Sequence, residues 1–256
     1  MLKLCKKGDE KKLLDFCGSS LFGSYISCRL LTYGFDFDFS LFWLGETDGK
    51  VTAAVSSLDG NAVVLTGEDA DIGELSQFVS MLGFSSVMYA ASLALEPLGY
   101  SVTLKKAFLF EGTASTKEAS SDCDMREVYR LASSSIPDSF PDTKDAYLHF
   151  LSDFTFRKNR GRARVFTLSE DEEIASCALT CAECDSSAVL SCVACREDKR
   201  GKGLGKKTVL SLCSELSSEG KKVYVIALNE AAEGFYKSIG FAEHCTVAFA
   251  ERKNDV

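Results

Sequence analysis

A short glycine-rich segment, EDKRGKGLGKK at residues 197–207, combines backbone freedom with positive charge. Its three glycines and five basic residues are Gly201, Gly203, Gly205, Lys199, Arg200, Lys202, Lys206 and Lys207. Glycines remove the Cβ atoms that would hold a ligand away, and they permit backbone angles that turn N–H groups inward. A strand-like run precedes the segment and an amphipathic run follows it. Because the first turn of a helix carries unpaired N–H groups and a positive dipole end, the segment is predicted to bind an anion such as phosphate.

Two common phosphate-binding motifs do not fit this segment. A P-loop would need glycine at the position of Arg200 and Ser or Thr at the position of Lys207. A dinucleotide-binding fingerprint that begins at Gly203 would need glycine at the position of Thr208. The pattern that fits is R-x-x-G-x-G, from Arg200 to Gly205, between a strand and a helix. The alternative interpretation is a solvated, charged helix start without a ligand.

The chain also contains 11 cysteines, four of them in two C-x-x-C pairs, Cys181 with Cys184 and Cys192 with Cys195. Four thiolates could form a tetrahedral zinc site. Both pairs, however, lie in strand-like sequence, where residues i and i+3 point to opposite faces, and neither pair contains Gly or Pro. We therefore expect reduced, buried cysteines and no metal site, with a zinc-binding structural protein as the alternative. The odd number of cysteines favours a reducing compartment.

The composition of the 256-residue chain is that of an ordinary globular protein, with 46% hydrophobic and 26% charged residues. A formal net charge of −8 argues against a broad basic face for nucleic acid, so any anion site must be local. No stretch approaches the roughly 20 apolar residues of a membrane-spanning helix, and the N-terminal residues do not form a signal-peptide core. We expect a cytoplasmic protein without nucleic-acid or membrane partners, and the oligomeric state is left open.

Residues 111–122 have no apolar periodicity and are rich in Ser, Thr, Ala and Glu, as is typical of an exposed linker. This predicts domains over residues 1–112 and 123–256, joined by a linker over 113–122. Helices are predicted over 123–135, 140–160, 204–216 and 230–240, and strands over 162–168, 172–183, 186–194, 221–228 and 242–251. The fold class is therefore α/β (α+β), with a mixed, mainly antiparallel sheet flanked by helices.

The order of these motifs resembles the GNAT acyltransferase superfamily, over roughly residues 125 to 250. The R-x-x-G-x-G segment is similar to the acetyl-CoA pyrophosphate loop of that family. The following strand ends in Asn229, within VIALN, and the next helix carries Tyr236 shortly before a Gly-Phe pair, within FYKSIGF. The resemblance implies a GNAT-like fold, acetyl-CoA as co-substrate, and transfer of an acetyl group to a primary amine of a small molecule or peptide.

The resemblance also implies which residues bind the coenzyme: Val193, Ala194, Cys195, Arg200, Gly201, Lys202, Gly203, Leu204, Gly205, Lys206, Asn229 and Tyr236. Tyr236 would also act as the catalytic general acid that protonates the departing thiolate. Two alternatives stay open, namely that Asn229 only caps a helix and that Tyr236 only packs in the core. The general base is not assigned. Glu183, Glu197 and Asp198 lie near the relevant strands, and a chain of waters is equally compatible.

The first half of the chain contains a degenerate copy of the same pattern, which predicts a tandem, duplicated fold. Residues 49–67 parallel 172–194, and residues 96–110 parallel 237–251. In place of the basic glycine segment, residues 66–78 contain four carboxylates, which repel a pyrophosphate: Glu68, Asp69, Asp71 and Glu74. Leu95 stands where the second half has Tyr236. Only the second half is therefore expected to bind acetyl-CoA, and a non-catalytic acyl-CoA sensor or interaction module is the alternative function.

Overall fold

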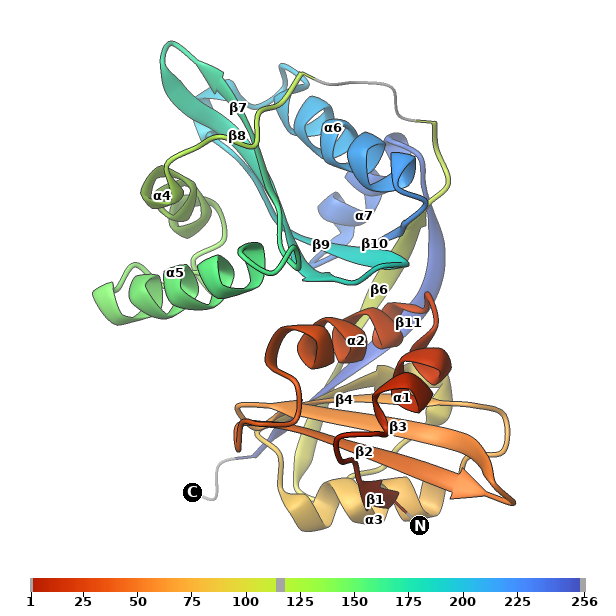
Figure 1. Ribbon diagram of the computed structural model, residues 1–256. Coiled ribbons are helices and arrows are strands. Elements are labelled where there is room, and N and C mark those ends of the chain that lie inside the picture. The colour runs from red at the N-terminus through yellow and green to blue at the C-terminus, as the bar shows by residue number, and fades with distance from the viewer. Residues whose placement is uncertain (1, 114–117, 254–256) are drawn as a thin grey trace. The chain divides into compact units, whose positions relative to one another are not determined.

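The structure is a computed structural model that describes residues 2–113 and 118–253 (Figure 1). Contacts divide the chain into two compact units. The first unit comprises Met1–Phe108, Ile226–Gly234 and Glu243–Val256, and the second comprises Leu109–Val225 and Phe235–Ala242. The first unit thus takes in two segments from the C-terminal part of the sequence. The division into domains 1–112 and 123–256 stays a prediction, and its linker over 113–122 falls partly outside the described residues.

In the first unit, a pair of helices is followed by three antiparallel strands, a helix and a parallel strand. The elements are β1 (Leu2–Leu4), α1 (Glu10–Cys17), α2 (Leu21–Tyr33), β2 (Ser40–Thr47), β3 (Lys50–Leu58), β4 (Asn61–Thr66), α3 (Ile72–Leu82), β5 (Ser86–Ala90), the 3-10 turn η1 (Ala91–Leu93) and β6 (Tyr100–Phe110). Strands β2, β3 and β4 pair antiparallel, and β5 pairs parallel to β4. Helices α1 and α2 cover one face of this sheet and α3 covers the other (Figure 1).

The second unit repeats this order of elements. They are α4 (Met125–Ser135), α5 (Lys144–Lys158), β7 (Val165–Glu170), β8 (Glu173–Glu183), β9 (Ser187–Cys195), the 3-10 turn η2 (Glu197–Lys199), α6 (Leu204–Ser218) and β10 (Lys222–Ile226). In the sequence they are followed by α7 (Glu230–Ser238) and β11 (Phe241–Arg252), whose residues are divided between the two units. Strands β7, β8 and β9 pair antiparallel, and β10 pairs parallel to β9. Helices α4 and α6 pack on β8 and β9 from opposite faces (Figure 1). The predicted mixed, mainly antiparallel sheet flanked by helices is confirmed.

The last strand of the chain completes the sheet of the first unit. Strand β11 pairs antiparallel with β5, from Val247 opposite Ala90 to Glu251 opposite Ser86. The Arg252 guanidinium then donates to the carbonyl of Gly83 at 3.0 Å. Since Val247, Ala248 and Ala250 are buried, this strand contributes apolar surface to the core of the first unit. The C-terminal residues of the sequence are therefore part of the N-terminal sheet.

Each unit has its own apolar core, built by the periodic residues of its elements. In the first unit the core gathers Trp43, Leu75, Val79 and Phe84 around the strands, and in the second it gathers Val128, Leu131, Phe154 and Leu179. No helix in the described ranges is long and apolar enough to cross a membrane. Helix α6, which follows the glycine-rich loop, packs on β7, β8 and β9 of the second unit.

Candidate functional site

The glycine-rich loop lies between the end of β9 and the start of α6, as the sequence predicts. Gly203 is the N-cap residue of α6, with φ of 78°, and Gly201 has φ of 80°. Both angles lie in the left-handed region that favours glycine. A Cβ atom on either residue would meet no atom within 4 Å, so the space before the helix is open. The N-cap residue Gly203 has no side chain to cap α6, so the first-turn N–H groups of this helix, apart from that of Gly205, which contacts the Cys195 thiol, are suited to an anion.

Two lysines of the loop are held by carboxylates from the turn between β7 and β8. The ammonium of Lys199 lies 2.7 Å from Asp171 and 3.3 Å from Glu170. The ammonium of Lys202 lies 3.4 Å from the same Glu170. The hydrogen bond that Lys199 donates to Asp171, followed by the one that it donates to Glu170, raises the pKa of Lys199. These ion pairs link the loop to the hairpin of β7 and β8, and no local sequence pattern predicts them.

Of the remaining basic residues, Arg200 lies in the loop, and Lys206 and Lys207 lie in the first turn of α6. Lys207 pairs with Glu118 at 2.8 Å. Arg200 donates from Nε to the carbonyl of Cys195 at 3.4 Å, and for Arg200 and Lys206 we find no ion pair within residues 2–113 and 118–253. The positive charge that an anion would meet is therefore smaller than the sequence suggests. Backbone N–H groups and these two side chains are the available donors, while Leu204 anchors the helix start in the core.

Strand β9 is bulged just before the loop. Its register with β8 shifts between the pairs Cys177–Ala194 and Leu179–Ser191, and Cys192 has φ of 48°. Parallel pairing with β10 ends at Leu190. Residues 193–195, which are the predicted coenzyme-binding residues Val193, Ala194 and Cys195, follow that paired stretch. A bulge of this kind re-aims backbone groups, and here it interrupts pairing with β8 only locally, because Ala194 and Cys195 pair with Cys177 and Ser176.

The Cys195 thiol lies between this strand and the first turn of α6. Burial raises the pKa of this thiol. The charge of Arg200 and the hydrogen bond from the Gly205 N–H lower the pKa, but by less than burial raises it. The thiol is therefore neutral at pH 7, because an ordinary cysteine pKa already lies above that pH. The site does not activate Cys195 as a nucleophile.

Tyr236 is buried on α7, with 6% of its surface exposed. Its ring centroid lies 5.3 Å from that of Phe235 and 5.5 Å from that of Phe241. Burial raises the pKa of Tyr236, with smaller contributions from Cys213 and from Cys192 in the β9 bulge. The hydroxyl is therefore protonated at neutral pH, as a general acid must be. The same environment also suits a tyrosine that only packs in the core.

Asn229 caps the N-terminus of α7. Its Oδ1 accepts a hydrogen bond from the N–H of Ala232 at 2.9 Å, and its carbonyl accepts from Glu233 at 3.0 Å. The helix-cap interpretation therefore accounts for this side chain. Asn229 also lines a cavity of about 360 Å³ in the first unit, together with Leu104, Lys106 and other residues of β6, α7 and β11.

Comparison with known proteins agrees with this geometry. The family model of the FR47-like protein matches residues 169–250, which contain the bulged strand, the loop and α6. No curated protein matches the chain in sequence. The chain is similar in structure to a GNAT-family acetyltransferase from Colwellia psychrerythraea, at 12% identity and a TM-score of 0.59, over 99% of this chain and 100% of that one.

Two further solved structures match along the whole chain. One is a GCN5-related N-acetyltransferase from Sphaerobacter thermophilus, at 13% identity and a TM-score of 0.63, over 100% of this chain and 96% of that one. The other is a tandem GNAT protein from the clavulanic acid biosynthesis pathway, at 14% identity and a TM-score of 0.60, over 100% and 99%. The chain has the tandem GNAT fold. The GNAT resemblance and the duplicated fold expected from the sequence are thus confirmed.

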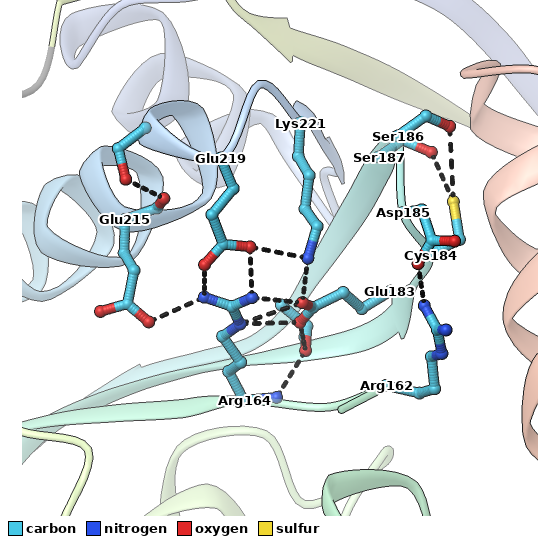
Figure 2. A network of polar contacts seen from close by, with 12 residues as sticks. Arg162, Arg164, Glu183, Cys184, Asp185, Ser186, Ser187, Glu215, Glu219 and Lys221 are labelled. Atoms are coloured by element: carbon cyan, nitrogen blue, oxygen red, sulfur yellow. Dashed lines mark hydrogen bonds and ion pairs between the residues drawn. The ribbon is translucent and has the colours of Figure 1, made fainter. Parts of the chain in front are cut away.

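In this tandem GNAT fold, two of the three acids considered as general base are held in ion pairs. Glu183 is fully buried between Arg164 and Lys221 (Figure 2). The hydrogen bond from Arg196 lowers the pKa of Asp198. Within the described ranges we find no ion pair for Glu197, which lies directly after β9. Glu197 and a chain of waters therefore stay as candidates for the base.

The first unit differs at the place that corresponds to the glycine-rich loop. There the N-cap residue of α3 is Asp71, whose Oδ1 accepts from the Glu74 N–H at 2.9 Å. Glu74 in turn accepts from the Leu2 N–H at 2.7 Å. Leu95, which stands where the second half has Tyr236, is buried in the core. This helix start is capped by its own carboxylate, so it presents neither the open amides nor the positive charge of α6.

Within the described residues, no group of three or more His, Cys, Asp or Glu side chains is arranged to hold a metal ion. The thiol of Cys181 donates to the carbonyl of Val189 at 3.5 Å. The thiol of Cys184 instead lies 3.1 Å from the hydroxyl of Ser187 (Figure 2). The two cysteines of this C-x-x-C pair thus contact different partners, which agrees with their positions on a strand and its turn.

Proposed function

We propose that this chain is an acetyl-CoA-dependent N-acetyltransferase that transfers an acetyl group to a primary amine of a small molecule or peptide. The observation that carries the proposal is the start of α6. The N-cap residue is Gly203, which has no side chain to cap the helix, and a Cβ atom at Gly201 or Gly203 would meet no other atom within 4 Å. This helix start belongs to a tandem GNAT fold. A pyrophosphate fits this arrangement because uncapped first-turn amides and the helix dipole attract multiply charged anions.

In this proposal the side chains and backbone of the second unit have separate tasks. The first-turn amides of α6, with Arg200 and Lys206, bind the pyrophosphate. The backbone of residues 193–195 holds the extended arm of the coenzyme, which supplies the acetyl group as a thioester. A backbone N–H at the end of β9 polarises the carbonyl oxygen. The amine nitrogen forms a bond to the carbonyl carbon, and the bond from that carbon to sulfur breaks. Tyr236, which is protonated at neutral pH, gives its proton to the leaving sulfur and regains one from solvent, and the amine proton passes to Glu197 or to water.

We further propose that one acetyl-CoA binds per chain. The capped, acidic start of α3 in the first unit repels a pyrophosphate, whereas the start of α6 attracts one. The first unit would then bind no coenzyme of its own. We expect the protein in the cytoplasm, where 11 cysteines stay reduced.

A second candidate is a non-catalytic acyl-CoA-binding module, and specific contacts favour it. The Tyr236 ring is enclosed by Phe235 and Phe241, and the Asn229 amide is used as a helix cap. Glu183 and Asp198 are both engaged in ion pairs. A chain that keeps the anion-binding start of α6, but whose other polar side chains only stabilise the fold, would bind acyl-CoA without turnover.

Two measurements on the full chain separate these functions. Calorimetric titration with acetyl-CoA measures binding, and we expect one site per chain. Chromatographic detection of released coenzyme A, across a panel of primary amines, measures turnover without a thiol reagent that the 11 cysteines would consume. Amine-dependent release supports the acetyltransferase. Binding without release supports the sensor, and the absence of binding would contradict both proposals.

A further inference from the structure

An exposed cluster of aromatic and acidic residues lies in the loop between α2 and β2. We call it the aromatic–acidic patch, and its residues are Tyr33, Asp36, Phe37, Asp38 and Phe39. The Phe37 and Phe39 rings stack with centroids 5.0 Å apart. Tyr33 meets both rings edge-on, with centroid distances of 6.4 and 5.5 Å. The three rings thus form a single aromatic surface.

Packing of the core does not account for this surface. Phe35, in the same loop, lies 5.5 Å from the ring of Phe42, which is 1% exposed, so Phe35 has a clear structural role. Phe37 and Phe39, in contrast, are each 41% exposed. Burial of such rings against a partner would be favourable, because apolar surface would leave water. These two residues stabilise each other but keep a broad face toward solvent.

The polar surroundings of the patch are acidic. Asp36 and Asp38 are exposed, and for neither do we find a hydrogen bond or an ion pair within residues 2–113 and 118–253. Asp59, in the turn between β3 and β4, is also exposed and donates its N–H to the carbonyl of Phe39 at 2.9 Å. Three exposed aspartates therefore belong to the patch or contact its backbone. A partner for this surface has to be positively charged and partly apolar.

We propose that the aromatic–acidic patch binds an arginine-containing peptide segment of a partner protein. The guanidinium group is planar, stacks on aromatic faces and donates paired hydrogen bonds to carboxylates, so one arginine can use both parts of the patch. The chain itself contains the same kind of stack, with the Arg160 guanidinium carbon 3.5 Å from the ring centroid of Phe156. The proposal is independent of acetyl transfer, because it uses only the loop between α2 and β2 and the turn at Asp59.

The test is a nuclear magnetic resonance titration of the full-length protein at low salt. The probe is a blocked pentapeptide of alternating arginine and leucine. Two matched peptides carry citrulline, which is neutral and of nearly the same shape, or glutamate in place of arginine. We expect the arginine peptide to shift the backbone signals of residues 33–40 and of Asp59. The citrulline peptide should bind at least fivefold more weakly, and the glutamate peptide should leave these signals in place.

Matched variants locate the binding. The double variants Phe37→Ser with Phe39→Ser, and Asp36→Asn with Asp38→Asn, should each weaken binding at least fivefold. Leu148→Ser removes an apolar side chain that is 48% exposed in the other unit, and it should leave binding unchanged. If the phenylalanine variant does not fold, the aspartate variant alone decides. Equal affinity for the arginine and citrulline peptides, shifts confined to other residues, or unchanged affinity in the aspartate variant would overturn the proposal.

Discussion

The carboxylate of Glu183 lies 2.7 Å from the guanidinium of Arg164, and Glu183 has none of its surface exposed (Figure 2). Arg164 also reaches Glu215 at 2.7 Å and Glu219 at 2.5 Å, both at the C-terminal end of α6. Lys221 pairs with Glu183 and Glu219 from the other side. This network joins the end of β8 to the helix whose opposite end carries the glycine-rich loop.

The variant Arg164→Met should destabilise the protein strongly. It leaves three carboxylates with the single cation Lys221, and one of them, Glu183, is fully buried. Loss of one partner from a buried ion pair costs about 3 to 5 kcal/mol. Chemical denaturation measures this loss. Adding Glu183→Gln to Arg164→Met should restore part of the stability, because it restores the balance of charge.

The control for this variant is Lys50→Met. Lys50 pairs with Asp69 at 3.5 Å, but the side chains are 71% exposed for Lys50 and 67% exposed for Asp69. An exposed ion pair of this kind contributes about 0 to 1 kcal/mol. If the Arg164 variant is no less stable than the Lys50 variant, the network does not contribute to the stability of the protein.

Glu219 should make part of the stability sensitive to acid. The hydrogen bond from Arg164, with a further one from Lys221, lowers the pKa of Glu219 to about 2. An ordinary glutamate titrates at about 4.3, so the unfolded chain binds this proton first as the pH falls. The stabilisation is therefore complete above about pH 5 and is lost as the pH falls toward 2.

Unfolding free energies of the parent and of Glu219→Gln, measured from pH 6 to pH 2, check this expectation. The parent should be the more stable protein at pH 6. The difference between the two should narrow as the pH falls, because only the parent gains a proton at residue 219 on unfolding. A difference that stays constant over this range would mean that the pKa of Glu219 is not lowered by its partners.

Local sequence patterns predicted most of the second unit because their signals lie within single elements. The apolar spacing that begins at Leu204, and the end signal at Gly220, predicted a helix over 204–216, and α6 spans Leu204–Ser218. Gly220 has φ of 76°, as expected after a helix end. The parallel between residues 96–110 and 237–251 likewise identified two equivalent strands, β6 and β11.

Long-range pairing could not be predicted from the same patterns. The apolar residues of β11 show that it is a buried strand, but they do not show that its partner is β5 in the first unit. The charge of the glycine-rich loop was overestimated for the same reason. Lys199 pairs with Asp171, which lies 28 residues earlier in the chain, and only the fold brings the two together.

The glycine N-cap of α6 should be essential for acetyl-CoA binding. Gly203→Glu places a carboxylate in the open space before the first-turn amides, where it opposes a pyrophosphate by charge and by volume. Acetyl-CoA should raise the melting temperature of the parent but not of this variant.

Gly220→Glu is the matched control, because Gly220 follows the other end of α6, has a similar φ of 76°, and has open space where a Cβ atom would lie. Both variants should lose about 1 to 2 kcal/mol of stability through the left-handed backbone. Only the Gly203 variant should lose the response to acetyl-CoA, and an equal response in both would place the anion site elsewhere.

Tyr236→Phe should separate coenzyme binding from turnover. The substitution keeps the packing against Phe235 and Phe241 and removes only the hydroxyl. Acetyl-CoA affinity should stay within a few fold of the parent, while turnover should fall by about 10²-fold or more if proton donation to the thiolate limits the rate. Tyr129→Phe is the control, since the Tyr129 hydroxyl only donates to the carbonyl of Pro141 at 2.8 Å. Unchanged turnover in Tyr236→Phe would assign this residue to core packing.

Removal of residues 246–256 should loosen the first unit and spare the second. The deletion takes away the part of β11 that pairs with β5, together with the buried Val247, Ala248 and Ala250. Strand β5 then has an unpaired edge, so its backbone N–H groups exchange with water. Hydrogen exchange should therefore accelerate by orders of magnitude over residues 86–90, while the amides of α6 stay protected. A shorter deletion, of residues 254–256, leaves every described pairing in place and serves as the control. Equal loss of protection in β5 and α6 would show that the two units unfold together. Strand β11 would then stabilise both units and not the first alone.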